Sequence, residues 1–162
     1  MASFDKTQFL KKSALVNISL FGIICLYLIL NLPFLTTFPP INNVGDESWM
    51  MNLSIELLKT GKPLVSIAPH TPNAEEVQVN TFWLHIYTLS SIFAIFGTSI
   101  WLGRFLSFLC GIFVILLTCR FGRDVRGPKV GLTAAFFLTT FIGFSWHSRE
   151  KRPEMMLMMF TT

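Results

Sequence analysis

Apolar runs separated by short polar segments divide the chain. The runs cover residues 14–35, 81–96, 102–119 and 130–147, and a last one begins at 155. A helix that spans a bilayer needs about 20 mostly apolar residues, so 14–35 is long enough to cross. The run 81–96 is shorter than a full span and contains His85 and several Ser and Thr residues. This pattern predicts helices, most of them in contact with lipid.

The polar segment 36–80 contains one amphipathic pattern. A helix over 48–59 would carry its apolar residues on one face, namely Met50, Leu53, Leu57 and Leu58. Asp46 stands just before this helix, where an N-cap is expected, and Gly61 ends it. We therefore expect an interfacial helix that lies on the membrane.

Composition supports a membrane protein. Hydrophobic residues make up 52% of the chain and charged residues 14%, whereas a soluble domain has roughly a quarter charged residues. The net charge of +4 does not indicate a nucleic-acid partner, because the basic residues flank apolar runs, where membrane topology accounts for them. No Cys/His spacing resembles a zinc site. We expect an all-α polytopic membrane protein with no nucleic-acid partner.

Two basic clusters predict which ends face the cytoplasm. The first is Lys6, Lys11 and Lys12, and the second is Arg120, Arg123, Arg126 and Lys129. Cytoplasmic loops collect Lys and Arg, so the N-terminus and the turn near residue 127 should both be cytoplasmic. A cleaved signal peptide is the alternative for the first run. That run is longer than a typical signal core and is not followed by a small-x-small cleavage site.

The number of crossings between the two clusters must then be odd. Only one of 81–96 and 102–119 can cross, and 102–119 leads directly into the second cluster. We expect one transmembrane region over 1–162, with spans at about 14–35, 102–119 and 130–147 and the start of a fourth at 155–162. An outer loop, 36–101, would carry interfacial helices at 48–59 and 81–96. The alternative is that both middle runs cross and the charge rule fails at one loop.

This topology brings two charged groups to the outer side. Asp46 and Glu47 follow the first span, and a second group follows the third span, namely Arg149, Lys151, Arg152 and Glu154. Charges at a membrane are usually paired or functional. A carboxylate can serve as general base toward an acceptor hydroxyl, and arginines can neutralise a departing phosphate. These residue types suit the transfer of a sugar from a polyprenyl phosphate.

Several short motifs, in this order, resemble the N-terminal part of membrane glycosyltransferases of family 39 and of aminoarabinose-transferase-like proteins, which have the GT-C fold. The motifs are Asp46-Glu47, Gly61-Lys62-Pro63, Phe82-Trp83-Leu84, Phe96-Gly97-Thr98-Ser99, Arg104-Phe105-Leu106-Ser107, Gly122-Arg123 and Ser148-Arg149-x-x-Arg152-Pro153-Glu154. The resemblance implies a lipid-phosphate-linked sugar donor and an acceptor that is a protein, a lipid or a glycan outside the cytoplasm. Such proteins have many more helices, so we expect this chain to be part of a longer protein in the inner or plasma membrane.

The resemblance also implies roles for individual residues. Asp46 would be the catalytic base with Glu47 beside it, Glu154 a second acidic site residue, and Arg149 or Arg152 the contact to the donor phosphate. Arg104 is a further candidate for substrate binding. Its alternative role is to reach the outer interface beside Trp101.

Other interpretations stay open at this point. Asp46 can be a helix cap only, Glu47 a favourable charge at a helix N-terminus, and Glu154 a local partner of Arg149 or Arg152. No cofactor is assigned, and two acidic residues do not decide whether a divalent metal binds. The alternative function is a small polytopic transporter or membrane-assembly subunit without catalysis.

Overall fold

The computed structural model describes residues 6–37, 46–64 and 82–162, with the backbone alone for 6–13 and for Asp46. Within these ranges the chain is helical and contains no β-strand. The elements are α1 (Lys6–Asn31), the 3-10 helix η1 (Leu32–Phe34), α2 (Asp46–Thr60), α3 (Trp83–Phe96), α4 (Ile100–Arg126), α5 (Pro128–Thr140), α6 (Ile142–His147) and α7 (Glu154–Thr161). The expectation of an all-α membrane protein is confirmed.

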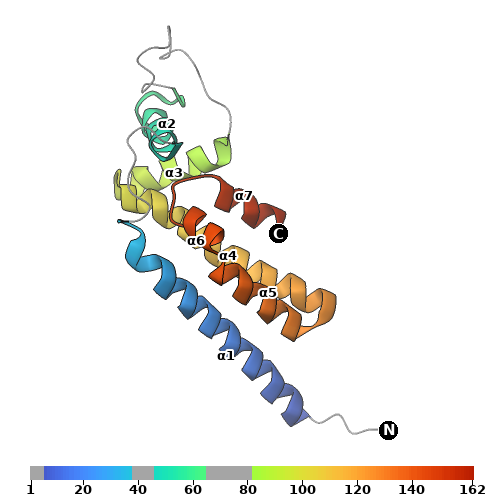
Figure 1. Ribbon diagram of the computed structural model, residues 1–162. Coiled ribbons are helices and arrows are strands. Elements are labelled where there is room, and N and C mark those ends of the chain that lie inside the picture. The colour runs from blue at the N-terminus through green and yellow to red at the C-terminus, as the bar shows by residue number, and fades with distance from the viewer. Residues whose placement is uncertain (1–5, 38–45, 65–81) are drawn as a thin grey trace.

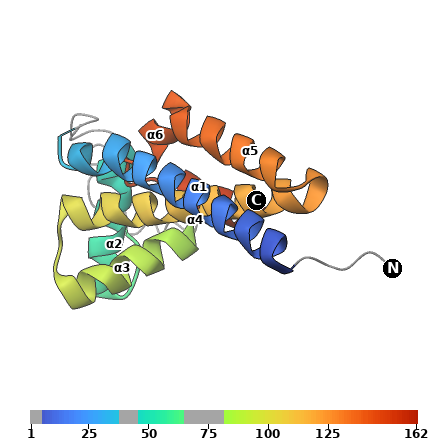
Figure 2. The ribbon, with the colours of Figure 1, turned by 90° about the horizontal axis from the view of Figure 1, so that it is seen from below.

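The helices form an elongated bundle around α4. Helices α4 and α5 are antiparallel, and α1 lies along them (Figure 1). In both views the beginning of α1 and the α4–α5 turn lie at the same end of the bundle (Figure 2). The end of α1, the start of α4 and helices α2 and α3 lie toward the opposite end. Segments far apart in the sequence therefore meet there.

Two helical segments of the described part of the chain are long and apolar enough to cross a membrane. They are Ala14–Phe34, with 21 residues, and Ile100–Arg126, with 27 residues. Helix α3 is apolar but shorter. The helix expected over 48–59 runs from Asp46 to Thr60, and its buried apolar residues include Met50, Leu53 and Leu57. The assignment of the individual spans stays a prediction.

The region 130–147 is not one continuous helix. Phe141 separates α5 from α6 with an extended backbone, φ −72° and ψ 120°. The backbone N–H of Ser145 then donates to the Phe141 carbonyl and begins the next helical turn. Gly143 leaves room for the Phe141 ring, because a Cβ at Gly143 would lie 2.7 Å from the Phe141 Cε1 atom. The expected third span therefore contains a break near its C-terminal end.

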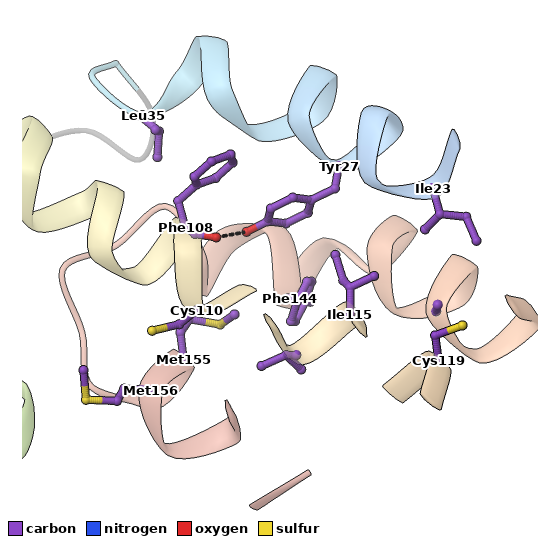
Figure 3. Packing of buried hydrophobic residues seen from close by; sticks show 12 residues of the cluster. Ile23, Tyr27, Leu35, Phe108, Cys110, Ile115, Cys119, Phe144, Met155 and Met156 are labelled. Atoms are coloured by element: carbon purple, nitrogen blue, oxygen red, sulfur yellow. Dashed lines mark hydrogen bonds between the residues drawn. The ribbon is translucent and has the colours of Figure 1, made fainter. Parts of the chain in front are cut away.

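Tyr27 attaches α1 to the rest of the bundle (Figure 3). Its ring is fully buried, stacks on Phe108 with centroids 5.1 Å apart, and lies 5.9 Å from the Phe144 ring. A buried phenol needs a hydrogen-bond partner, and here the hydroxyl donates to the Phe108 carbonyl at 3.1 Å. Gly111 lies under this hydroxyl, and a Cβ there would collide with it. The missing side chain at Gly111 thus lets α1 approach α4.

Two glycines allow close contact between α4 and α5. A Cβ on Gly131 would collide with the Cys119 carbonyl oxygen and lie 2.9 Å from the Arg123 backbone nitrogen. A Cβ on Gly122 would lie 2.8 Å from the Gly131 Cα atom. Small residues allow this kind of backbone approach between membrane helices.

We predict that Gly131→Ala destabilises the bundle. The colliding atoms belong to the backbone and cannot move aside, so the two helices must separate, at a cost of about 1–3 kcal/mol. Thermal unfolding in detergent, followed by circular dichroism, should show a lower melting temperature. Gly22→Ala is the matched control, because nothing lies within 4 Å of its Cβ position. Equal melting temperatures for the two variants would contradict the close contact.

Candidate functional site

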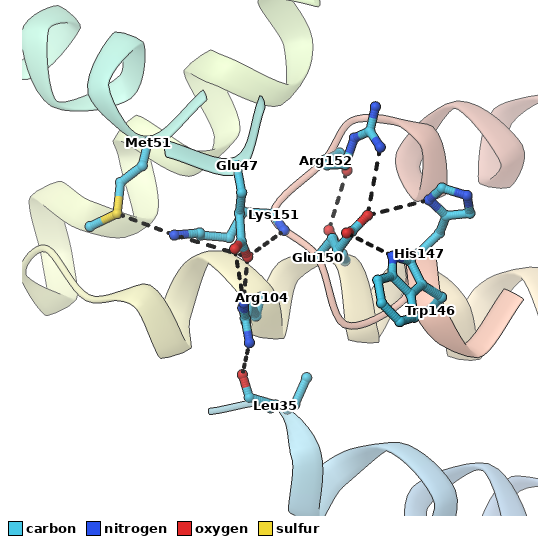
Figure 4. A network of polar contacts seen from close by, with 10 residues as sticks. Leu35, Glu47, Met51, Arg104, Trp146, His147, Glu150, Lys151 and Arg152 are labelled. Carbon is cyan, nitrogen blue, oxygen red and sulfur yellow. Dashed lines mark hydrogen bonds and ion pairs between the residues drawn. The ribbon is translucent and has the colours of Figure 1, made fainter. Parts of the chain in front are cut away.

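A buried ion pair joins the first turn of α2 to the second turn of α4 (Figure 4). The Arg104 Nε donates to Glu47 Oε1 at 2.6 Å, and Arg104 Nη2 donates to Glu47 Oε2 at 2.8 Å. This is the bidentate geometry in which a guanidinium matches a carboxylate. Arg104 has no exposed surface, and Glu47 is 9% exposed. The pair therefore fixes the position of α2 on α4.

Two further segments complete this cluster. The Arg104 Nη1 donates to the Leu35 carbonyl at 3.1 Å, just beyond η1. The Lys151 backbone N–H, between α6 and α7, donates to Glu47 Oε1 at 3.1 Å. We refer to Leu35, Glu47, Arg104 and Lys151 as the buried clamp. It joins the end of α1, the start of α2, the start of α4 and the α6–α7 connection.

The side chain of Lys151 is also buried, with 1% of the residue exposed. Its Nζ lies 4.0 Å from Glu47 Oε1 and 3.5 Å from the Met51 sulfur. Burial lowers the pKa of this amine below its usual 10.5, and the nearby Glu47 carboxylate partly opposes that effect. The aliphatic part of Lys151 packs on Gly103, where a Cβ would collide with it. Gly103 therefore makes room for Lys151 beside the ion pair.

A second polar cluster lies around the connection between α6 and α7, which we call the α6–α7 corner (residues 148–153). Glu150 accepts a hydrogen bond from Trp146 Nε1 at 2.8 Å and lies 3.5 Å from His147 Nδ1. Arg152 Nη1 lies 3.7 Å from Glu150, and Arg152 Nη2 lies 2.9 Å from Glu154 Oε1. Arg152 is thus held between two carboxylates while its side chain keeps 29% exposure.

Arg149 occupies a different environment from Arg152. Its Nε donates to the Ser145 carbonyl at 2.9 Å, and its guanidinium lies 5.6 Å from the centre of the Phe34 ring. Burial lowers the pKa of Arg149, but an arginine stays protonated in proteins. The neighbouring Ser148 donates to the side-chain oxygen of Asn31 at 3.4 Å. These contacts attach the α6–α7 corner to the end of α1.

The structure brings most of the predicted site residues into these two neighbouring clusters. Glu47 and Arg104 belong to the buried clamp, while Arg149, Arg152 and Glu154 lie at or next to the α6–α7 corner. Asp46 is the first residue of α2, and its side chain lies outside the described part of the structure. The interpretation of Arg104 as an interface residue beside Trp101 is wrong. Its side chain points to Glu47 and Leu35, and the Trp101 ring stacks on Phe105 instead.

The sequence did not predict a role for Lys151 in the site, although this lysine belongs to the charged group that follows the third expected span. Its position directly before Arg152-Pro153-Glu154 was the only signal. The residue that makes room for it, Gly103, is recognised as such only in the structure. No three His, Cys, Asp or Glu side chains that the structure describes lie close enough together to hold a metal ion.

The fold and the two clusters define an all-α membrane protein with paired charged side chains at one end of its bundle. Residues 83–162, just under half of the chain, match the family described as dolichyl-phosphate-mannose-protein mannosyltransferase. The match supports a relationship of these residues to membrane glycosyltransferases, and it confirms the resemblance predicted from the motifs. It includes Arg104 and the α6–α7 corner, but neither Asp46 nor Glu47. No curated protein and no solved structure matches the chain.

We predict that the clamp residues are strongly coupled in stability. Glu47→Leu alone leaves Arg104 buried without its partner, which costs about 3–5 kcal/mol, whereas the double variant Glu47→Leu/Arg104→Leu should recover much of this loss. Unfolding in detergent of the two single variants and the double variant measures the coupling.

The Arg123–Asp124 pair provides the control. Its atoms are 3.7 Å apart and its side chains are 51% and 63% exposed, so its coupling should be about 0–1 kcal/mol. A Glu47–Arg104 coupling no larger than this would show that the clamp does not hold α2 on α4.

Proposed function

We propose that the protein transfers a sugar from a polyprenyl-phosphate donor to an acceptor hydroxyl, at the end of the bundle where the buried clamp lies. The observation that carries this proposal is the contact of Glu47 with both Arg104 and the Lys151 backbone. Through it, the start of α2, with Asp46, is held next to the α6–α7 corner. The family match supports a donor of this class.

The contacts of Glu47 indicate that it and the neighbouring Asp46 have different roles. Both carboxylate oxygens of Glu47 accept hydrogen bonds from Arg104, and one of them also accepts from Lys151. The Glu47 carboxylate is therefore engaged by protein donors in a buried ion pair and is not free to contact an acceptor hydroxyl. We therefore assign Glu47 a positioning role and Asp46 the role of base.

Arg152 is the better of the two candidate contacts to the donor phosphate. Arg152 is partly exposed, whereas Arg149 has only 9% of its surface exposed and lies against Phe34. Glu150 and Glu154 hold the Arg152 guanidinium in place. In the reaction, Asp46 takes the proton of the acceptor hydroxyl and the acceptor oxygen attacks the anomeric carbon. The bond from that carbon to the phosphate oxygen breaks, and the phosphate leaves with the bonding electrons beside Arg152.

We further propose that the clamp end of the bundle faces away from the cytoplasm, so that the protein is multi-pass with a cytoplasmic N-terminus. The start of α1 and the α4–α5 turn, which carry the two basic clusters, lie together at the other end (Figures 1 and 2). Basic residues collect on the cytoplasmic side of membrane proteins. The acceptor is then a hydroxyl of a protein, lipid or glycan outside the cytoplasm.

Asp46→Asn tests the assignment of the base. In membranes that carry the full-length protein, the variant should lose at least about 100-fold in the rate of sugar transfer, because a positioned general base contributes about 10²–10⁴-fold. The assay follows labelled sugar from a panel of polyprenyl-phosphate donors.

Asp124→Asn is the matched control, since Asp124 is an exposed aspartate next to the α4–α5 turn. It should transfer sugar at the unmodified rate. An Asp46→Asn rate within a few-fold of the control would remove Asp46 from the mechanism.

A further inference from the structure

A cavity of about 250 Å³ lies between the start of α3 and helix α7. Its lining is mostly apolar and includes Phe82, Trp83, Met156, Leu157 and Phe160. Four of these side chains are also exposed at the surface: Phe82 is 49% exposed, Trp83 62%, Leu157 59% and Phe160 66%. The cavity therefore opens onto an apolar surface of the kind that faces lipid.

One polar side chain lines this cavity without any partner in the described part of the chain. His85 is 2% exposed, and neither of its ring nitrogens makes a hydrogen bond. Buried polar groups are nearly always hydrogen-bonded, and an unpaired one costs about 1–3 kcal/mol. An unpaired imidazole in the wall of an open cavity points to a ligand that brings the missing polar atom.

The position of the cavity connects it to the α6–α7 corner. Pro153, which also lines it, lies between Arg152 and Glu154 in the chain. A ligand whose head reaches this corner can therefore extend its apolar part directly into the cavity. Burial lowers the pKa of His85 to about 4, so its imidazole is neutral at pH 7 and can donate one hydrogen bond.

We propose that the cavity holds the first isoprene units of the lipid donor, with His85 hydrogen-bonded to the donor phosphate. This inference rests on the proposed function. The size is appropriate, because a cavity of about 150 Å³ takes up benzene, so about 250 Å³ holds roughly ten carbon atoms, or two isoprene units. The rest of the chain would continue across the exposed apolar surface into the bilayer. Free phosphate alone would gain nothing from these walls.

Calorimetric titration of the full-length protein in nanodiscs tests the proposal, with geranyl phosphate, geraniol and inorganic phosphate as probes. Leu157→Trp fills the mouth of the cavity and should weaken geranyl phosphate and geraniol at least tenfold, without changing the binding of inorganic phosphate. His85→Leu should weaken geranyl phosphate at least tenfold and leave geraniol unchanged, because only the phosphate loses a hydrogen bond.

Control variants and melting temperatures distinguish a loss of ligand binding from a loss of folding. Leu58→Trp places the same side chain at an exposed leucine of α2 outside the cavity and should bind every probe as the unmodified protein does. His85→Leu should melt at the same or a higher temperature, because it removes an unpaired buried polar group. Leu157 is exposed, so its replacement should not impair folding.

Affinities for geranyl phosphate within twofold of the unmodified protein in both Leu157→Trp and His85→Leu would overturn the cavity assignment. If the unmodified protein still transfers sugar in that case, only this inference fails. If the unmodified protein neither binds geranyl phosphate nor transfers sugar, the proposed function fails with it.

Discussion

The buried ion pair between Glu47 and Arg104 determines how the charged segments of this protein meet. Both groups lose nearly all contact with water, so the pair needs further hydrogen bonds, and the Leu35 carbonyl and the Lys151 backbone provide two of them. Because these partners come from four separate elements, the clamp fixes the start of α2 relative to the α6–α7 corner. Any chemistry shared between Asp46 and Arg152 depends on that arrangement.

The helices themselves could be predicted from the apolar pattern, since apolar length and spacing are local properties. The charged residues of the site could be singled out because charges beside apolar runs are unusual. Their pairing could not be predicted, because Glu47 and Arg104 are 57 residues apart and meet only through tertiary packing. An arginine beside a tryptophan near a helix end looks the same in sequence whether it reaches the interface or a buried carboxylate.

Other features of the structure are indicated even less by the sequence. The break at Phe141 has no proline at or next to it, and the role of Lys151 depends on the missing side chain of Gly103. His85 appeared as one polar residue in an apolar run, and only the structure shows that it lines a cavity without a hydrogen-bond partner. In the proposed mechanism, Glu47 has a structural role, and its neighbour Asp46 is the catalytic base.

The most direct test of a shared site is to measure which side of the membrane the clamp end of the bundle faces. Single cysteines at Lys59, Glu154 and Asp124, in a protein without its native cysteines, are labelled with a membrane-impermeant thiol reagent in intact cells and in inverted vesicles. The account predicts that cysteines at positions 59 and 154 react in the same preparation, and that the one at position 124 reacts in the other. Reaction of positions 59 and 154 from opposite sides would contradict a shared site.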